Sequence, residues 1–283
     1  MQAVSPAMEL VRIKKEAASI LTRHGLTLPF DPVEFNVTAS NIYEPCSCTS
    51  ISTQLLDSVF PKTGPTEVLH FTRPEVLPSL LEYKSLWLAS IIKRLDEGEY
   101  IRFAEEHGYA SANSKKIRKD LAQNYFYTSF TAVGSASAAT HWNDFSAQGS
   151  GFCLRFSLTP NSADLRNIQY QTNAKTLLTR IDEELKASIG RTFFPRGIAR
   201  LSAFYLGQDL AYEDEIRLMV SNPQAVTKFM HRGYEYVAIR LEFDNPWCAV
   251  RLSSITCGNA GDEQYVRRLT QRFGFDHITI HAR

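Results

Sequence analysis

The residues best placed for chemistry are the carboxylates of the segment 212–217, Tyr-Glu-Asp-Glu-Ile-Arg, whose pattern predicts a β-strand. Side chains alternate along a strand, so Glu213, Glu215 and Arg217 are predicted to share one face, with Ile216 on the other. Two carboxylates one pleat repeat apart suit acid/base catalysis or the stabilisation of a cation-like sugar. A solvent-facing strand with an Arg–Glu ion pair explains the same pattern, so the segment alone leaves both interpretations open.

A second candidate is the predicted strand over 67–72. His70 and Thr72 share one face of it, opposite Leu69 and Phe71, and both side chains can hydrogen-bond to a sugar. A single His on a strand is more often a hydrogen-bonded core residue than a ligand. The neighbouring hydroxyl on the same face is what makes this strand a candidate site.

A third candidate is the hydroxyl-rich part of a predicted strand over 125–130. Tyr127, Thr128 and Ser129 follow one another there among aromatic residues that favour strands. The simplest interpretation is that these hydroxyls satisfy neighbouring backbone groups. Within the sequence these three separated segments are the candidates that remain after other chemistries are excluded.

Several common chemistries have no signature in the sequence. It contains no glycine-rich phosphate loop, no Gly-x-Ser-x-Gly elbow and no His-Glu-x-x-His helix, which argues against dinucleotide-fold enzymes, P-loop enzymes, hydrolase triads and metalloproteases. Five cysteines without paired Cys-x-x-Cys spacing predict free thiols in a reducing compartment, although Cys46 and Cys48 flank a single residue. A net charge of +1 and the lack of a long apolar run predict a soluble protein with no membrane partner.

The elements that must position these segments predict a mixed α+β fold. An amphipathic helix over 5–24 with Ser5 as its cap is followed by an irregular segment at 28–64, so residues 1–65 are predicted as a helical extension with a linker and 66–283 as one domain. The 91–120 segment is charged and predicts a solvated helical face, or a basic lobe at Lys115–Lys119. Further elements are predicted as helices from Pro74, around His141, at 173–189 with Asn173 as cap and at 262–273, and as strands at 86–89, 152–158, 237–243, near 255 and at 278–280.

Short segments between residues 66 and 283 also occur in a characteristic order: His70-Phe71-Thr72, Leu86-Trp87, Asp96, Ser129-Phe130-Thr131, Trp142 with Phe145, Gly151, the 212–217 segment and Ile255-Thr256-Cys257-Gly258. This ordered set is similar to an uncharacterised bacterial domain family. The chain departs from that family's pattern in three places, where Leu95 replaces an Asn, Ser129 a Cys and Leu210 a Trp. The chain therefore resembles a divergent member.

The same segments, His70-x-Thr72, Tyr127-Thr128-Ser129 and Glu213-x-Glu215, more distantly resemble the ADP-ribosyltransferase superfamily. The resemblance implies a split antiparallel β-sheet with flanking helices and NAD as the substrate, without a metal. It implies Glu215 as the catalytic carboxylate and Glu213 as its partner near the acceptor. NAD would be bound by His70, Phe71 and Thr72 on the first strand and by Tyr127, Thr128 and Ser129 on the second.

The resemblance further implies a mono-ADP-ribosyltransferase, for example a bacterial toxin or effector, acting on a protein or nucleic-acid acceptor in the cytoplasm or after non-classical export. Two other hypotheses stay open: a non-catalytic binding module that uses the basic run, and an NAD glycohydrolase. If the resemblance holds, His70, Ser129 and Glu215 converge on one cleft. Ser129 then supports Glu215 by a hydrogen bond, and Arg217 acts as a structural counter-charge.

Overall fold

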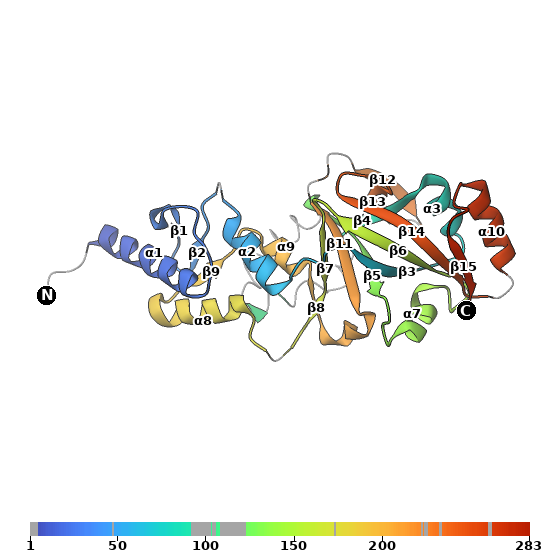
Figure 1. Cartoon of the computed structure of the whole chain (residues 1–283). Helices are drawn as coiled ribbons and strands as arrows, with labels where there is room; N and C mark the ends of the chain where they lie inside the picture. The colour runs from blue at the N-terminus through green and yellow to red at the C-terminus, as the bar shows by residue number, and fades with distance from the viewer. Residues whose placement is uncertain are drawn as a thin grey trace. The chain divides into compact units, whose positions relative to one another are not determined.

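The computed structural model describes residues 5–46, 48–91, 103, 106–107, 123–172, 174–221, 223, 226–231, 234–259 and 262–283 (Figure 1). The predicted basic run Lys115–Lys119, together with Leu95 and Asp96, lies outside the described residues. The chain forms two compact units. The first contains the described residues up to 61, between 94 and 120, and from 171 to 206; the second contains those from 62 to 93, from 121 to 170, and from 207 to 283.

The first unit is mostly helical and includes a small sheet in the order β1-β2-β9, with β2 and β9 parallel. Its elements are α1 (Pro6–Arg23), η1 (Pro32–Glu34), β1 (Asn36–Val37), β2 (Asn41–Tyr43), α2 (Ser50–Val59), α8 (Leu177–Ile189), β9 (Thr192–Phe194), α9 (Ile198–Ser202) and β10 (Tyr205–Leu206). The predicted first helix is confirmed: the Ser5 side chain accepts a hydrogen bond from the Met8 N–H, and Pro6 occupies the first turn. The segment at 28–64, predicted as an irregular connection with short elements, contains the helix α2, which is 10 residues long.

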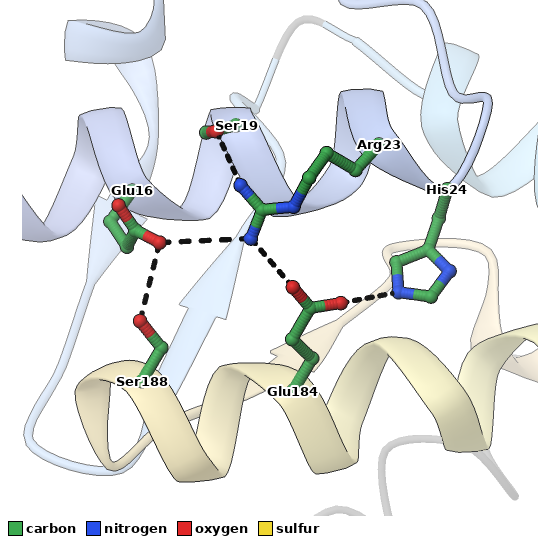
Figure 2. Close-up of polar contacts among 6 residues, drawn as sticks. All are labelled: Glu16, Ser19, Arg23, His24, Glu184 and Ser188. Atoms are coloured by element: carbon green, nitrogen blue, oxygen red, sulfur yellow. Dashed lines mark hydrogen bonds and ion pairs between the residues drawn. The ribbon is translucent and has the colours of Figure 1, made fainter.

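Helices α1 and α8 pack together through their apolar stripes, and polar contacts flank that packing (Figure 2). Arg23 Nη2 lies 2.6 Å from Glu184 Oε1, and Glu184 Oε2 lies 2.8 Å from His24 Nε2. Ser188 Oγ donates to Glu16 Oε1 at 3.2 Å. These pairs are partly exposed, so they align the two helices while burial of the apolar stripes supplies most of the stability.

Two predictions about this unit need correction. Helix α8 begins at Leu177, because the Thr176 hydroxyl accepts the Thr179 N–H at 3.1 Å and caps the helix. The predicted cap, Asn173, lies outside the described residues. The unit bounds also differ from the predicted division at 65/66, since residues 171–206 group with the N-terminal segment. The reason is that the apolar face of α1 needs a partner, and α8 supplies it from far along the chain.

The second unit contains the three candidate segments. Its elements are β3 (Thr66–Thr72), α3 (Leu77–Tyr83), β4 (Ser85–Ser90), β5 (Tyr125–Ala132), α7 (Ala138–Phe145), β6 (Phe152–Pro160), β7 (Asp164–Asn167), β8 (Gln169–Tyr170), η2 (Gln208–Glu213), β11 (Glu215–Ser221), β12 (Thr227–His231), β13 (Tyr234–Glu242), β14 (Cys248–Cys257), α10 (Glu263–Arg272) and β15 (Thr279–Ala282). Helices and strands are interspersed, which confirms the mixed α+β class. None of the described helices is long and apolar enough to cross a lipid bilayer.

One large sheet organises this unit in the order β12-β13-β4-β5-β3-β6-β14-β15, and β11 lies between β5 and β7 (Figure 1). The predicted antiparallel sheet is in fact mixed, because β15 pairs parallel to β14 after the chain crosses over through α10. One face of the sheet carries the main apolar core, where Val68, Phe130 and Leu218 pack with residues of α3 and α10. On the opposite face Phe71 packs against Trp142 of α7.

Candidate functional site

The three candidate segments lie on neighbouring strands, with β5 in the centre. On one edge, β5 pairs with β11 over its length, from Glu215 opposite Thr131 to Ser221 opposite Tyr125. Its other edge is shared: β3 pairs with it near residues 131–132, and β4 pairs with it near residues 126–127. Between these two pairings the described strands leave residues 128–130 of β5 without a register partner on that edge. The sheet is therefore split beside Ser129.

His70 bridges this split. Its Nδ1 donates a hydrogen bond to the Ser129 backbone carbonyl at 3.2 Å, and its ring meets Phe130 edge-on, with the ring centroids 5.6 Å apart. A small pocket of about 100 Å³ lies at this point, lined by His70, Thr128 and Trp87 among others. The imidazole thus satisfies a strand carbonyl that has no strand partner there, while one side of the ring borders the pocket.

On the other face of the sheet, Glu215 is held by three donors. Ser129 Oγ donates to Glu215 Oε1 at 2.5 Å, and Arg217 binds both carboxylate oxygens, through Nε to Oε1 at 2.7 Å and through Nη2 to Oε2 at 2.8 Å. The Glu215 and Arg217 side chains are only 3% and 1% exposed. These contacts confirm the predicted hydrogen bond from Ser129 to Glu215, and they show that Arg217 forms an ion pair with Glu215.

A second buried ion pair lies beside the first. Arg166 on β7 stands directly opposite Arg217, and its Nη2 lies 2.9 Å from Asp164 Oδ1. The Tyr127 ring lies against the Arg217 guanidinium, whose Cζ is 4.6 Å from the ring centroid. This pair was not predicted from the sequence, although its acid-x-Arg spacing repeats that of Glu215 and Arg217. Two buried ion pairs therefore lie side by side on this face of the sheet.

Glu213 does not lie where the sequence analysis placed it. It ends the 3₁₀ helix η2, and the strand begins only at Glu215. Between them Asp214 adopts a left-handed conformation with φ of 45°, which Asp tolerates better than most residues and which breaks the alternation of side chains. The prediction that Glu213 and Glu215 share one face of a strand is therefore wrong. Glu213 is nevertheless 91% buried, two residues before the catalytic candidate.

The prediction that His70, Ser129 and Glu215 converge on one cleft is wrong, because the side chains of His70 and Glu215 lie on opposite faces of the sheet. Register pairs Val68 with Ala132 and Leu69 with Thr131, so the His70 side chain is on the face of the main core, while the Ser129 hydroxyl and Glu215 are on the other. His70 binds the backbone carbonyl of Ser129, and Glu215 binds the side-chain hydroxyl of Ser129.

The remaining predicted residues are divided between the two faces. Thr128 lines the pocket beside His70, and Thr72 is buried at the end of β3 on that same face. Phe71 is on the opposite face, where it contacts Trp142 and His141. Tyr127 is also on that opposite face, under Arg217. Of the predicted NAD-binding residues, Ser129 contacts Glu215 directly, and Tyr127 contacts its ion-pair partner Arg217.

Replacing Ser129 with Ala is expected to lower the free energy of unfolding by about 1.5–3 kcal/mol, because a hydrogen bond to a charged group is worth that much. Urea denaturation measures the change. Ser253→Ala is a matched control, since Ser253 Oγ donates 2.9 Å to a neutral backbone carbonyl of Arg155 and should cost only about 0.5–1.5 kcal/mol. An equal or smaller loss in the Ser129 variant would argue against a charge-assisted hydrogen bond between Ser129 and Glu215.

A dependence of stability on pH is expected from His70. Burial lowers the pKa of His70, and its hydrogen bond to the Ser129 carbonyl only partly offsets this. In the unfolded chain His70 takes up a proton near pH 6.5, whereas in the folded protein it takes one up only at a lower pH. The contribution of His70 to the free energy of unfolding is therefore complete above about pH 6.5 and is lost as the pH falls through the lower pKa of the folded state.

His70→Asn tests this dependence, because Asn keeps a donor near the Nδ1 position but does not titrate. Urea denaturation from about pH 8 to about pH 5 should show that the parent loses stability relative to the variant as the pH falls. His281→Asn, at an exposed position in the same unit, serves as the control. A difference between parent and His70→Asn that stays constant with pH would contradict the expectation.

Within the described residues, no group of three or more His, Cys, Asp or Glu side chains is arranged to hold a metal ion. No protein-family model, curated protein or solved structure matches this chain. The functional conclusion therefore depends on the geometry around Ser129 and Glu215.

Proposed function

We propose that this protein is an NAD-dependent mono-ADP-ribosyltransferase with Glu215 as its catalytic carboxylate. The observation that supports the proposal most is the 2.5 Å hydrogen bond from Ser129 Oγ to Glu215 Oε1, made between neighbouring strands. A carboxylate oriented in advance by a hydroxyl is what stabilisation of a cation-like ribose requires. The split of the sheet beside Ser129 agrees with an ADP-ribosyltransferase-like split-sheet core.

The reaction would break the bond between the nicotinamide nitrogen and C1′ of the ribose. Nicotinamide leaves as a neutral molecule with the bonding electron pair, and positive charge develops on the ribose. Glu215 would stabilise that charge, while a nucleophilic atom of the acceptor bonds to C1′ and gives its proton to a base. Glu213, buried two residues before Glu215, is the carboxylate we assign as that base. The acceptor would be a protein or a nucleic acid, as expected for a toxin or effector.

His70 would bind the adenosine ribose in this proposal. Its Nδ1–H is used by the Ser129 carbonyl, so the neutral ring has Nε2 left as an acceptor for a ribose hydroxyl. The lowered pKa of His70, caused by burial, keeps the ring neutral at physiological pH. Because His70 and Glu215 lie on opposite faces of the sheet, a bound dinucleotide would have to pass across the split beside Ser129.

A second candidate function is a non-catalytic binding module on the same fold. The observation that favours it is the two-point ion pair between Arg217 and Glu215, which neutralises a buried carboxylate that catalysis would need. To bind Glu215, a substrate ribose would have to donate a further hydrogen bond to Oε2 or displace Arg217. An NAD glycohydrolase would use the same carboxylate with water as the acceptor.

Incubation of the full-length protein with NAD distinguishes these functions. Nicotinamide release with ADP-ribose attached to an added acceptor mixture supports the transferase, and free ADP-ribose as the main product supports the glycohydrolase. The Glu215→Ala variant must lose either activity. If the parent neither binds NAD at millimolar concentration nor releases nicotinamide, both enzyme functions are excluded and the binding module remains.

A further inference from the structure

The turn from Tyr212 to Glu215 decides where both candidate carboxylates lie. Tyr212 and Glu213 end η2, Asp214 is left-handed, and Glu215 begins β11. A change in the backbone angles of Asp214 would therefore move the two carboxylates relative to each other. The strained conformation at Asp214 persists only if surrounding groups hold the turn at its ends.

Tyr170 holds the end of the turn at Glu215. Its Oη accepts a hydrogen bond from the Glu215 backbone N–H at 2.9 Å. The Glu215 carbonyl in turn accepts the Ile168 N–H, also at 2.9 Å. Both backbone polar groups of Glu215 are thus bound by residues 168–170, immediately after β7 ends. On the edge of β11 that faces β7, the Tyr170 side chain takes the place of a strand partner for the Glu215 N–H.

The Tyr170 hydroxyl also lies in the electric field of both carboxylates. Burial raises the pKa of Tyr170, and the negative charges of Glu215 and Glu213 raise it further, although the hydrogen bond from the Glu215 N–H acts in the opposite direction. The phenol therefore stays protonated at neutral pH. It accepts the backbone N–H and keeps its own O–H as a donor beside the two acids.

His141 holds the other end of the turn. It is fully buried on α7, and its Nε2–H donates 2.9 Å to the Tyr212 carbonyl. The rings of Phe71 and Phe145 lie around it, with centroids 5.5 and 5.8 Å away. Its Nδ1 has no hydrogen-bond partner among the described residues. Burying a His that has one unsatisfied nitrogen costs free energy. The other nitrogen, Nε2, makes the hydrogen bond to the turn.

We propose that Tyr170 and His141 form a two-point clamp on the Tyr212–Glu215 turn and act as positioning residues for Glu213 and Glu215. The inference rests on the proposed transfer function. The clamp fixes the distance between the carboxylate that stabilises the ribose cation and the carboxylate that receives the acceptor proton. Neither Tyr170 nor His141 needs to touch the substrate.

Tyr170→Phe tests one point of the clamp, since it removes only the hydroxyl. We expect kcat for nicotinamide release to fall by about 10- to 100-fold with little change in KM, because a misplacement of about 1 Å can cost that much. Hydrogen exchange followed by NMR supplies a readout that does not need activity. The Glu215 amide should exchange at least about 10-fold faster in the variant, while the Leu218 amide in mid-strand stays protected. Tyr265→Phe, at an exposed position on α10, is the control.

The other point is tested by comparing His141→Leu with His141→Gln. Leu removes the donor to the Tyr212 carbonyl, whereas Gln can restore it at a similar reach. We expect the Leu variant to lose kcat by about 10-fold or more and the Gln variant to recover most of it. If His141 only fills space among apolar side chains, the Leu variant should instead retain more activity than the Gln variant.

Unchanged exchange at the Glu215 amide in Tyr170→Phe would overturn the clamp, whatever the activity. Faster exchange with unchanged kcat, in a parent protein that releases nicotinamide, would overturn the positioning role. A His141→Leu variant as active as His141→Gln would do the same. If the parent releases no nicotinamide at all, the proposed function fails and the role in transfer fails with it, while the amide exchange still shows whether Tyr170 holds the turn.

Discussion

Glu215→Gln is expected to lower kcat for nicotinamide release by about 10²–10³-fold, the usual cost of removing one electrostatic contact to the transition state. In the proposed mechanism the negative charge acts mainly on the cation-like ribose, so KM for NAD should change much less than kcat. Gln retains the shape of the side chain and one oxygen, which can accept the Ser129 Oγ and Arg217 Nε hydrogen bonds now made to Oε1. Its NH₂ group cannot accept the bond from Arg217 Nη2. The loss therefore reports the charge of Glu215 together with its second bond to Arg217, and not its packing.

Glu67→Gln is the matched control for this experiment. Glu67 is on β3 in the same unit and pairs with Arg155, but its side chain is 48% exposed. Its substitution should leave kcat within about twofold, because exposed pairs contribute little. Glu213→Gln should reduce transfer to an acceptor more than it reduces nicotinamide release, if Glu213 receives the acceptor proton. Equal activity of Glu215→Gln and the parent would remove Glu215 from the mechanism.

Arg217→Met is expected to lower the free energy of unfolding by about 3–5 kcal/mol, because it leaves the buried Glu215 carboxylate without its two-point partner. The long Met side chain preserves much of the packing against Tyr127, so the loss reflects the unpaired charge. The double variant Glu215→Gln/Arg217→Met removes both charges. It should be more stable than Arg217→Met alone.

The surface pair Arg240–Glu242 provides the control for this prediction. It has the same two-residue spacing on a strand, but its side chains are 41% and 59% exposed. Arg240→Met should therefore cost no more than about 1 kcal/mol. Urea denaturation of the single and double variants gives all the values. A loss in Arg217→Met that matches Arg240→Met, or a double variant as unstable as the sum of the singles, would contradict the burial argument.

Local patterns were sufficient to predict most elements of the second unit. Residues that favour strands predicted β5, and the alternation of side chains predicted β13 and placed Ile216, which lies in the main core, on the face opposite Glu215. The Ser5 cap of α1 followed from the same kind of local chemistry. These predictions hold because side-chain periodicity and capping depend on residues a few positions apart.

Alternation failed where one residue changed the backbone. Asp214 is left-handed, so the carboxylates of Glu213 and Glu215 no longer follow the period of a strand. The segment at 28–64 was also predicted as irregular although α2 lies within it. The apolar residues of α2, Ile51, Leu55 and Leu56, are buried, but Ser and Thr residues between them weaken the helical pattern.

The sequence by itself determined the fold class and the residue types of the candidate site: a His-x-Thr strand, a hydroxyl-rich strand and an acid-x-Arg strand. Only the tertiary structure decided that β3, β5 and β11 are neighbours and that Ser129 Oγ meets Glu215 Oε1. It also decided that Arg166 stands opposite Arg217 and that Tyr170 and His141 hold the turn. Backbone pairing sets the strand order and the register, and these bring together residues that are from 45 to 86 positions apart in the sequence. Local periodicity does not predict which strands pair or in which register.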